Sequence, residues 1–426
     1  MSFIKRVCGW FWIALILFVL FLNLRLYSTS VLPKNNEALP RTILAQLKSN
    51  RFAIDHGAGE KMQGLFPEGF YFCYALHGLT WINVALRDSS YSDRAIAESE
   101  WCLGHLESEE GKAAFPQGLA PERGMFYSSW KAHLLAGIVL LDQGRDQEQL
   151  GRLRSECDSI ADALRKSSTP FLASYIDQSW PCDTVPAIHA MKMYDHVTGE
   201  ERYRDLIEQW LKETKSRLDP QTGLIPHFCR ADNGQPIQTA RATSQVIMLR
   251  FLVDVEPEFA DEQYKIFRRE FYAPLLGLPG FREHPSQSKL QGGDVDSGPL
   301  VLGRSLSATV SGMGIAQVFG DQAQSEAISA CGESAGFPWT QNEHKSYVAK
   351  VMPIGDIMVA YNHSSLPWIA DQDRPTRPTP IVMPIGWRWP THAISSLLLL
   401  PVLIGRFRKF RQRAKQSEKK SKTEAA

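Results

Sequence analysis

The sequence predicts an all-α chain that folds as an (α/α)6 toroid, or six-hairpin barrel, with flanking transmembrane helices. Two observations predict the toroid: a unit of two helices recurs about every 56 residues, and each unit joins an apolar helix to a charged one. A third observation predicts the flanking helices, because an uncharged apolar stretch lies near each end of the chain. A helix that is apolar on all sides is buried, whereas one with a charged face borders water. The alternation therefore predicts an inner ring of helices inside an outer ring.

The first element is the apolar stretch 7–25, which we expect to be a transmembrane anchor. No charged residue lies between Arg6 and Arg25, and the stretch has the roughly 17–25 residues that cross a hydrocarbon core. No small-residue cleavage site follows it, which argues against a signal peptide that is removed. Basic flanks favour the cytoplasmic side, so Lys5 and Arg6 place residues 1–6 in the cytoplasm.

The toroid itself is expected to occupy residues 41–370, outside the cytoplasm. Its apolar helices, each followed by a charged amphipathic helix, start near Phe70, Met125, Cys182, Ala240 and Ser305. A sixth pair would join the apolar stretch 353–362 to the helix 40–55. All inner helices then start at one end of the toroid, where the turns before them would line a central funnel. The positive ends of the helix dipoles favour anions and polar substrates at that end.

The second apolar stretch, 388–405, is expected to be another transmembrane helix, although it is shorter and contains His392 and Pro401. The segment 406–426 that follows is densely basic, and we expect it to be a disordered cytoplasmic tail that faces anionic lipid. Two spans would leave both termini in the cytoplasm and would make membrane lipid a partner of the chain.

The composition excludes some classes of function. The formal net charge of +1 argues against a nucleic-acid-binding protein, which usually has a basic face. The seven cysteines include no CxxC pair, so no structural zinc site is expected, and no metal or cofactor is predicted. Disulfides would form in an oxidising compartment, but the sequence leaves their pairing open. Association into a homo-oligomer is also left open.

Polar and aromatic residues recur in the turns before the inner helices. If the ring forms, these turns converge on one rim, where aromatic faces and polar groups would bind a substrate. The residues expected to bind substrate are Tyr71, Tyr74, Tyr127, Trp130, Trp180, His227, Arg241, Gln245, Asp294 and Asp296. Each feature also has a local explanation, since Asp183 could serve only as a helix cap and the segment 293–298 only as an Asx turn.

Three stretches of the chain resemble the linalool dehydratase-isomerase family. They are "SSWKAHLLAGIVLLDQG" at 128–144, the segment 182–224 that begins "CDTVPAIHAM", and the segment 233–271 that begins "NGQPIQTARATS". The similarity extends in order over about residues 54–320 and is strongest in the helical framework. The resemblance implies an (α/α)6 fold and a cofactor-free active site that uses an aspartate, tyrosines, a histidine and two cysteines as acid–base groups.

The resemblance also assigns individual residues. His133 falls where the family has its histidine, and Cys182 falls at the second active-site cysteine. Asp55 in "FAID" is similar to the family's catalytic aspartate. The first cysteine of the family's pair has no counterpart here. The tyrosine that follows the aspartate is missing too, with Tyr71 or Tyr74 as the substitute.

The residues and the resemblance together predict a membrane-anchored, cofactor-independent lyase or isomerase. Elimination of water from an alcohol needs one group that protonates the leaving hydroxyl and another that removes a proton. We expect Asp55, His133, Cys182 and Asp183 to supply this general acid–base chemistry in the funnel. The substrate would be an alcohol or another amphiphilic small molecule, which a bilayer would concentrate.

Two other functions stay open. A carbohydrate-active hydrolase or lyase of the six-hairpin glycosidase type would use Asp183 with Asp294 or Asp296 on a glycan, because glycoside hydrolysis needs two carboxyl groups at the scissile bond. A non-catalytic scaffold tethered in the cell envelope would need no such chemistry, and the two spans and the basic tail fit it.

Overall fold

The helices of the toroid alternate between an inner and an outer ring. The computed structural model describes residues 2–28, 31–32, 41–290, 292–369 and 386–424. Each inner helix packs against the next and the last packs against the first, so the inner ring is closed. The predicted (α/α)6 toroid is therefore confirmed. The inner helices are α4 (Gly69–Arg87), α7 (Gly124–Asp142), α9 (Pro181–Thr198), α11 (Ala242–Val255), α13 (Leu306–Val318) and α15 (Pro353–Ser364).

The outer helices pack on the inner ring through one apolar face each. In α10, for example, Leu206, Ile207, Trp210 and Leu211 are buried while the charged residues between them face solvent. The first outer helix, α2, packs on α15, so the two ends of the toroid form the sixth pair, as predicted. The outer helices are α2 (Arg41–Asp55), α5 (Ser92–Leu106), α8 (Gln147–Lys166), α10 (Arg204–Lys215), α12 (Pro257–Phe271) and α14 (Gln322–Ala335).

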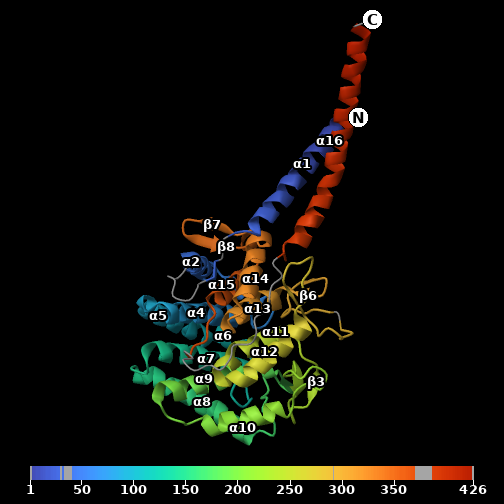
Figure 1. Cartoon of the computed structure of the whole chain (residues 1–426). Coiled ribbons are helices and arrows are strands. Elements are labelled where there is room, and N and C mark those ends of the chain that lie inside the picture. Colours follow the sequence, from blue (N-terminus) through green and yellow to red (C-terminus); the bar gives the residue numbers. More distant parts are fainter. Residues whose placement is uncertain (1, 29–30, 33–40, 291, 370–385, 425–426) are drawn as a thin grey trace.

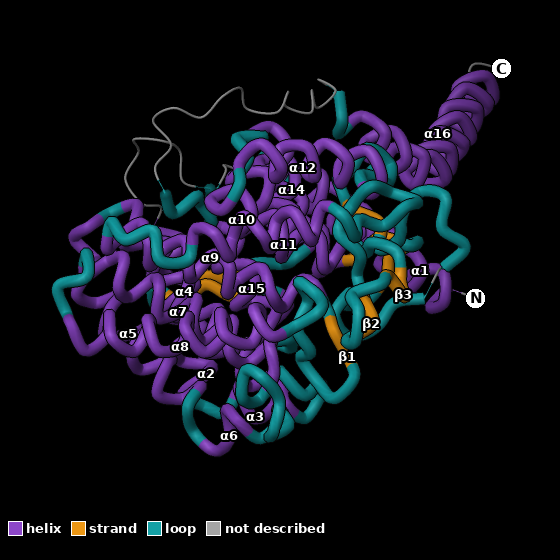
Figure 2. Tube along the Cα trace, turned by 90° about the horizontal axis from the view of Figure 1, so that it is seen from below, coloured by secondary structure: helices purple, strands orange, loops and turns teal. Residues whose placement is uncertain are grey.

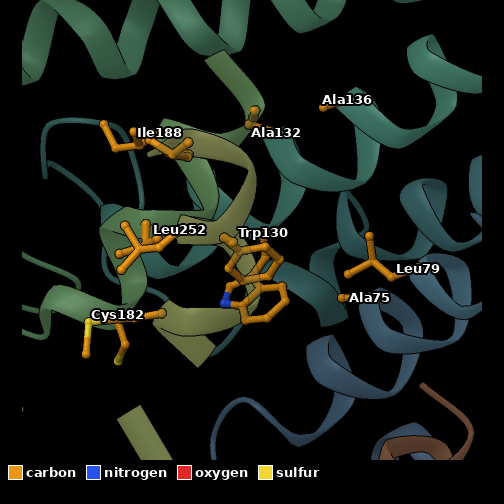
Figure 3. Close-up of a cluster of buried hydrophobic side chains, with 14 of the residues drawn as sticks. Ala75, Leu79, Trp130, Ala132, Ala136, Cys182, Ile188 and Leu252 are labelled. Carbon is orange, nitrogen blue, oxygen red and sulfur yellow. The ribbon is translucent and has the colours of Figure 1, made fainter. Parts of the chain in front are cut away.

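Small residues allow the inner helices to approach one another closely. A Cβ atom on Gly137 of α7 would lie 2.3 Å from the Ile82 side chain of α4 and 2.9 Å from Trp368. Figure 3 shows Trp130 of α7 between Ala75 and Leu79 on one side and side chains of α9 and α11 on the other. Because the inner helices are buried almost all round, the core fills the ring and fixes the rotation of each helix.

Short strands, which the all-α prediction did not include, tie the connections into the inner helices together. The antiparallel pairing of β1 with β2 links the turn before α9 to the turn before α11. Figure 2 shows β1, β2 and β3 together with loops at one side of the helices. The strands are β1 (Gln178–Ser179), β2 (Phe228–Arg230), β3 (Pro236–Gln238), β4 (Phe281–Arg282), β5 (Leu300–Val301), β6 (Arg304–Ser305), β7 (Trp339–Gln341) and β8 (His344–Ser346).

Two further helices, α1 (Ser2–Arg25) and α16 (Trp389–Glu424), run side by side away from the toroid, and both chain ends lie at their far end (Figure 1). Asn23 of α1 donates to Ser395 Oγ of α16 at 2.9 Å. Arg25 fixes the base of the pair to α14 through an ion pair with Glu333 at 3.2 Å. The name stalk is used below for α1 and α16.

Within the described residues, one helical segment, Trp389–Gln412, is long and apolar enough to span a membrane, and Gly9–Arg25 is a shorter apolar helix. The prediction of a span near the carboxyl terminus thus has support from length and composition, while the two-span arrangement with cytoplasmic termini stays a prediction. The expectation of a disordered tail is wrong, because α16 continues to Glu424. Its Lys, Arg, Gln, Glu and Ala residues all favour helix.

Candidate active site

All inner helices run in the same direction, so their first turns share one end of the toroid, here called the mouth. At the mouth, α9 begins with Pro181, whose fixed φ suits the first helical position. Cys182 and Asp183 follow in the same turn and are buried. The N-cap of α9 is Trp180 and no side chain caps it. Helix capping therefore does not explain the carboxyl group of Asp183.

Asp183 is a buried acid whose pKa lies near neutrality. Burial raises the pKa of its carboxyl group to about 7. The hydrogen bond from Ser174 Oγ to Asp183 Oδ2, at 2.5 Å, opposes that increase, whereas the negative charge of Asp296 adds to it. Around pH 7 the carboxyl group therefore exists in both protonation states, as a general acid requires.

Asp296 is the second carboxyl group with a raised pKa. It lies on the connection from α12 to α13 and keeps a side exposed to solvent. The surrounding protein nevertheless desolvates it, and together with the charges of Asp294 and Glu68 this raises its pKa to about 6. Glu68, which precedes α4, accepts a hydrogen bond from Tyr175 Oη. The mouth thus gathers carboxyl groups from three separate parts of the chain.

Arg241, the N-cap residue of α11, holds this connection in place. Its Nη1 and Nη2 donate to the two carboxylate oxygens of Asp294 at 2.5 and 2.9 Å, and its Nε donates to Glu283 Oε1 at 2.8 Å. Burial opposes ionisation of Asp294, but the hydrogen bonds from Arg241 prevail and lower its pKa to about 2. Asp294 is therefore a fixed anion, in contrast to Asp296, whose pKa is raised.

A directed chain of hydrogen bonds leads from Arg241 to Asp183. A guanidinium can only donate, so Arg241 Nη1 donates to His227 Nε2, at 3.3 Å. Burial and the charge of Arg241 lower the pKa of His227 to about 3, and the neutral ring must then carry its proton on Nδ1, 2.5 Å from Ser244 Oγ. Ser244 in turn bonds to Cys182, whose Sγ lies 3.6 Å from Asp183 Oδ1.

In this series of hydrogen bonds the Cys182 side chain is a protonated thiol that donates, and not a thiolate. Burial raises its pKa well above the usual range, and the neighbouring charge of Asp183 raises it further. The six cysteines of the described toroid are all free. No group of three or more His, Cys, Asp or Glu side chains among the described residues is arranged to hold a metal ion.

Aromatic rings border the carboxyl groups. Trp180 packs against Phe228 of β2, with ring centroids 4.9 Å apart, and Tyr175 meets Trp180 edge to face at 6.0 Å. Tyr71 and Tyr127, in the first turns of α4 and α7, are joined by a hydrogen bond of 2.6 Å from Tyr71 Oη to the Tyr127 carbonyl oxygen. Tyr71 and Tyr127 are buried, so the half-buried rings of Tyr175, Trp180 and Phe228 are the ones that offer a flat surface to a cyclic, hydroxyl-rich molecule.

Other residues predicted from sequence lie outside this cluster. Asp55 is exposed at the end of α2, where it pairs with Arg51 at 3.0 Å. Tyr74 stacks on His105 of α5 at 4.3 Å. Gln245 donates to the Ile225 carbonyl oxygen at 2.7 Å and so anchors a connection. Trp130 is a core residue (Figure 3). Among the described residues, none of these four side chains interacts with Asp183, Asp294 or Asp296.

The structure adds residues that the sequence analysis did not select. Ser174, Tyr175 and Glu283 contact the selected residues Asp183, Trp180 and Arg241, and Glu68 joins them through its hydrogen bond from Tyr175. Glu68 could have been found, because it lies in the turn "FPEGF" before an inner helix, as Asp183 does. Ser174, Tyr175 and Glu283 carry no such signal, because short strands bring them to the mouth.

His133 belongs to a buried network deeper in the toroid. His133 Nδ1 lies 3.2 Å from His189 Nδ1, and His189 Nε2 lies 3.1 Å from Asp254 Oδ2. Trp368 stacks on the His133 ring at 4.4 Å, and its backbone amide donates to Asp254. Burial lowers the pKa of both histidines, so both rings are neutral. His189 follows Cys182 by nearly two turns of α9, about 10 Å, which separates His133 from the mouth.

We expect His133→Phe to reduce the free energy of unfolding by about 1–3 kcal/mol and to leave any catalytic rate within about twofold, because it removes a buried hydrogen bond far from the mouth. Phenylalanine keeps the ring that stacks on Trp368. Urea unfolding followed by tryptophan fluorescence, together with rate measurements, tests this. A large loss of rate at unchanged stability would instead give His133 the catalytic role that the resemblance implies.

Comparisons with known proteins assign no family. No protein-family model matches the chain, and no curated protein matches it either. Nine chains among the solved structures match. One of them, a selenomethionine derivative of a GH76 alpha-mannanase from Bacteroides thetaiotaomicron, is 11% identical in sequence, with a TM-score of 0.40 over 68% of this chain and 84% of that chain.

Proposed function

We propose that the chain is an enzyme that cleaves glycosidic bonds at the mouth by general acid–base chemistry, with Asp183 as the acid and Asp296 as the base or nucleophile. The observation that carries this proposal is the pair of interacting carboxyl groups with pKa values of about 7 and about 6. Glycoside hydrolysis needs one carboxyl group protonated and another ionised at the same pH. Between these two values, that combination of protonation states is well populated.

The chemistry assigns a proton to each step. Asp183 gives its proton to the glycosidic oxygen as the bond to the anomeric carbon breaks. Asp296 takes a proton from the attacking water, or attacks the anomeric carbon itself before water replaces it. Water supplies the new hydroxyl group, so no other reactant is needed. The series of hydrogen bonds from His227 through Ser244 and Cys182 ends with the thiol donating to Asp183. This hydrogen bond stabilises the ionised carboxylate after the proton transfer.

The substrate class follows from the neighbours of the two acids. Trp180 and Phe228 offer aromatic rings beside Asp183. The Arg241–Asp294 pair offers fixed donors and acceptors for hydroxyl groups, because both side chains keep their charge at any pH near neutrality. These groups suit a neutral sugar ring.

Dehydration or isomerisation of an alcohol is the second candidate. The contact of Cys182 with Asp183 favours this second candidate. The resemblance to linalool dehydratase-isomerase implies an active site in which an aspartate and a cysteine act together. Asp183 would then protonate a leaving hydroxyl group and Asp296 would remove a proton from carbon. Asp55 and His133 take no part in this version, because both lie away from the mouth.

The full chain in detergent micelles can be tested on two substrate panels. Glycosides and oligosaccharides are assayed for new reducing ends, and long-chain and terpene alcohols are assayed for alkene products by gas chromatography. We expect new reducing ends with the wild-type chain and none with Asp183→Asn. Alkene without reducing ends would favour the second candidate, and neither product from a folded chain would favour the scaffold.

A further inference from the structure

The connection from α12 to α13, described over residues 272–290 and 292–305, joins the mouth to the base of the stalk. We call it the β4–β6 lobe. At the mouth it carries Glu283, Asp294 and Asp296. At the stalk, Thr391 Oγ1 of α16 donates to the Leu276 carbonyl oxygen at 3.0 Å. The lobe is therefore in direct contact with the helix that is long and apolar enough to span a membrane.

The contact between the lobe and the stalk is close. Gly277 has a φ of +82°, and a Cβ atom there would lie 2.1 Å from the Trp387 carbonyl oxygen. The turn thus needs glycine both for its backbone conformation and for the approach of α16. Trp387 is buried against Leu26, the residue that follows α1. Figure 1 places β6 near the base of the stalk and β3 away from it.

The lobe exposes several apolar side chains. Leu302 is 74% exposed, and its backbone is held by the bond from Arg304 Nη1 to the Leu302 carbonyl oxygen. Val295, between the two aspartates of the mouth, is also exposed. The exposed apolar side chains of the lobe are Leu276, Leu290, Val295, Val301 and Leu302. Several exposed apolar residues on one lobe are a feature of surfaces that bind an apolar partner.

The position of the lobe favours lipid as the partner that covers its apolar side chains. The first residue of α16, Trp389, is 72% exposed, and Tyr27 lies opposite it at the end of α1, stacked against His392 at 5.7 Å. Tryptophan and tyrosine at the ends of apolar helices are typical of the membrane–water interface. A bilayer crossed by α16 would begin at this level, where Thr391 of α16 also contacts Leu276 of the lobe.

We propose that the β4–β6 lobe rests on the lipid surface and presents the mouth to a glycosylated lipid, whose apolar chain stays in the bilayer while its sugar reaches Asp183 and Asp296. The assignment of a sugar to this substrate rests on the proposed function, whereas the contact of the lobe with lipid is independent of it. Val295 and Leu302 would lie along the exposed part of the apolar chain, between the bilayer and the two acids.

The lipid contact is tested with the full chain in nanodiscs of phosphatidylcholine and phosphatidylglycerol. Photoreactive benzoylphenylalanine replaces Leu302 in one variant and Ile237 in a control. Ile237 is 54% exposed and apolar but lies on β3, away from the stalk. After irradiation, mass spectrometry should find several-fold more lipid adduct at position 302 than at 237. Equal yields, or no adduct at 302, would overturn the proposal.

The substrate class is tested with the double variant Val301→Asp, Leu302→Asp. Its turnover of a glycosylated lipid in nanodiscs should fall at least tenfold, while turnover of a short water-soluble glycoside of the same sugar stays unchanged. Equal loss on both substrates would overturn the substrate assignment. If the wild-type chain cleaves neither glycoside, the proposed function fails, and an adduct at position 302 still establishes the lipid contact.

Discussion

Asp183→Asn should reduce kcat by a factor of about 10²–10⁴, the usual contribution of a general acid, and should stabilise the fold at alkaline pH. Asparagine has the shape of aspartate and can still accept the hydrogen bond from Ser174, so the first turn of α9 should persist. It cannot give a proton to a leaving group. Loss of activity with gain of stability is the signature of a group held in a costly state for function.

The sign of the stability effect follows from the pKa. Asp183 has a pKa of about 7 in the folded chain, against about 3.9 in an unfolded one. The folded state therefore binds the proton more tightly, and the wild-type chain loses stability as pH rises from about 4 to about 7. Asparagine does not titrate. The difference in free energy of unfolding between the variant and the wild type should therefore shift in favour of the variant by up to about 4 kcal/mol between pH 4 and a pH above 7. Urea unfolding at acid and alkaline pH measures this difference.

The pH dependence of kcat/KM should be a narrow bell. Its acid limb follows the ionisation of Asp296, near pH 6, and its alkaline limb the deprotonation of Asp183, near pH 7, as apparent values for the coupled pair. Asp232→Asn is the matched control, because Asp232 forms an exposed ion pair with Arg230. Wild-type rates and an unchanged bell in Asp183→Asn would remove Asp183 from the mechanism.

The architecture could be predicted because the residue pattern of each helix alone indicates whether that helix is buried. The inner helices are mostly apolar and most outer helices have a charged face, so the two rings follow without knowledge of any long-range contact. Even the pairing of α2 with α15 follows, since each lacked another partner. The short strands could not be predicted, because strands of two or three residues, such as β1, are too brief to show an alternating pattern.

The candidate site was predictable only in part. A polar residue in the turn before an inner helix must lie near the mouth, and this rule selects Cys182, Asp183, His227 and Arg241. A residue inside a helix is different, since its surroundings depend on depth and rotation. His133 lies in the third turn of α7, where its ring meets His189 and not Cys182. A similarity of local sequence does not carry that information.

Arg241→Met should reduce the free energy of unfolding by about 3–5 kcal/mol, the usual effect of removing one partner of a buried ion pair. Glu283 is fully buried and would keep only the hydrogen bond from Thr243 Oγ1, at 2.8 Å. Burial already raises the pKa of Glu283 despite its bond to Arg241. Without the guanidinium its pKa must rise further, so the loss of stability should be largest at alkaline pH and shrink as the carboxyl group becomes protonated.

A second substitution separates the stability of the fold from the position of the lobe. Arg241→Met with Glu283→Gln leaves no buried charge, and we expect most of the lost stability to return. Activity should stay low, because Asp294 then keeps only the local hydrogen bond from the Ser297 backbone amide, and the segment that carries Asp296 is no longer fixed to α11. Arg241→Lys keeps the charge but not the bidentate hydrogen bonds to Asp294, so its stability and its rate should both lie between those of the wild type and Arg241→Met.

A double variant that regains full activity along with stability would mean that Arg241 only neutralises Glu283. A double variant that stays active only on water-soluble glycosides would place the effect of Arg241 on the path from the lipid instead.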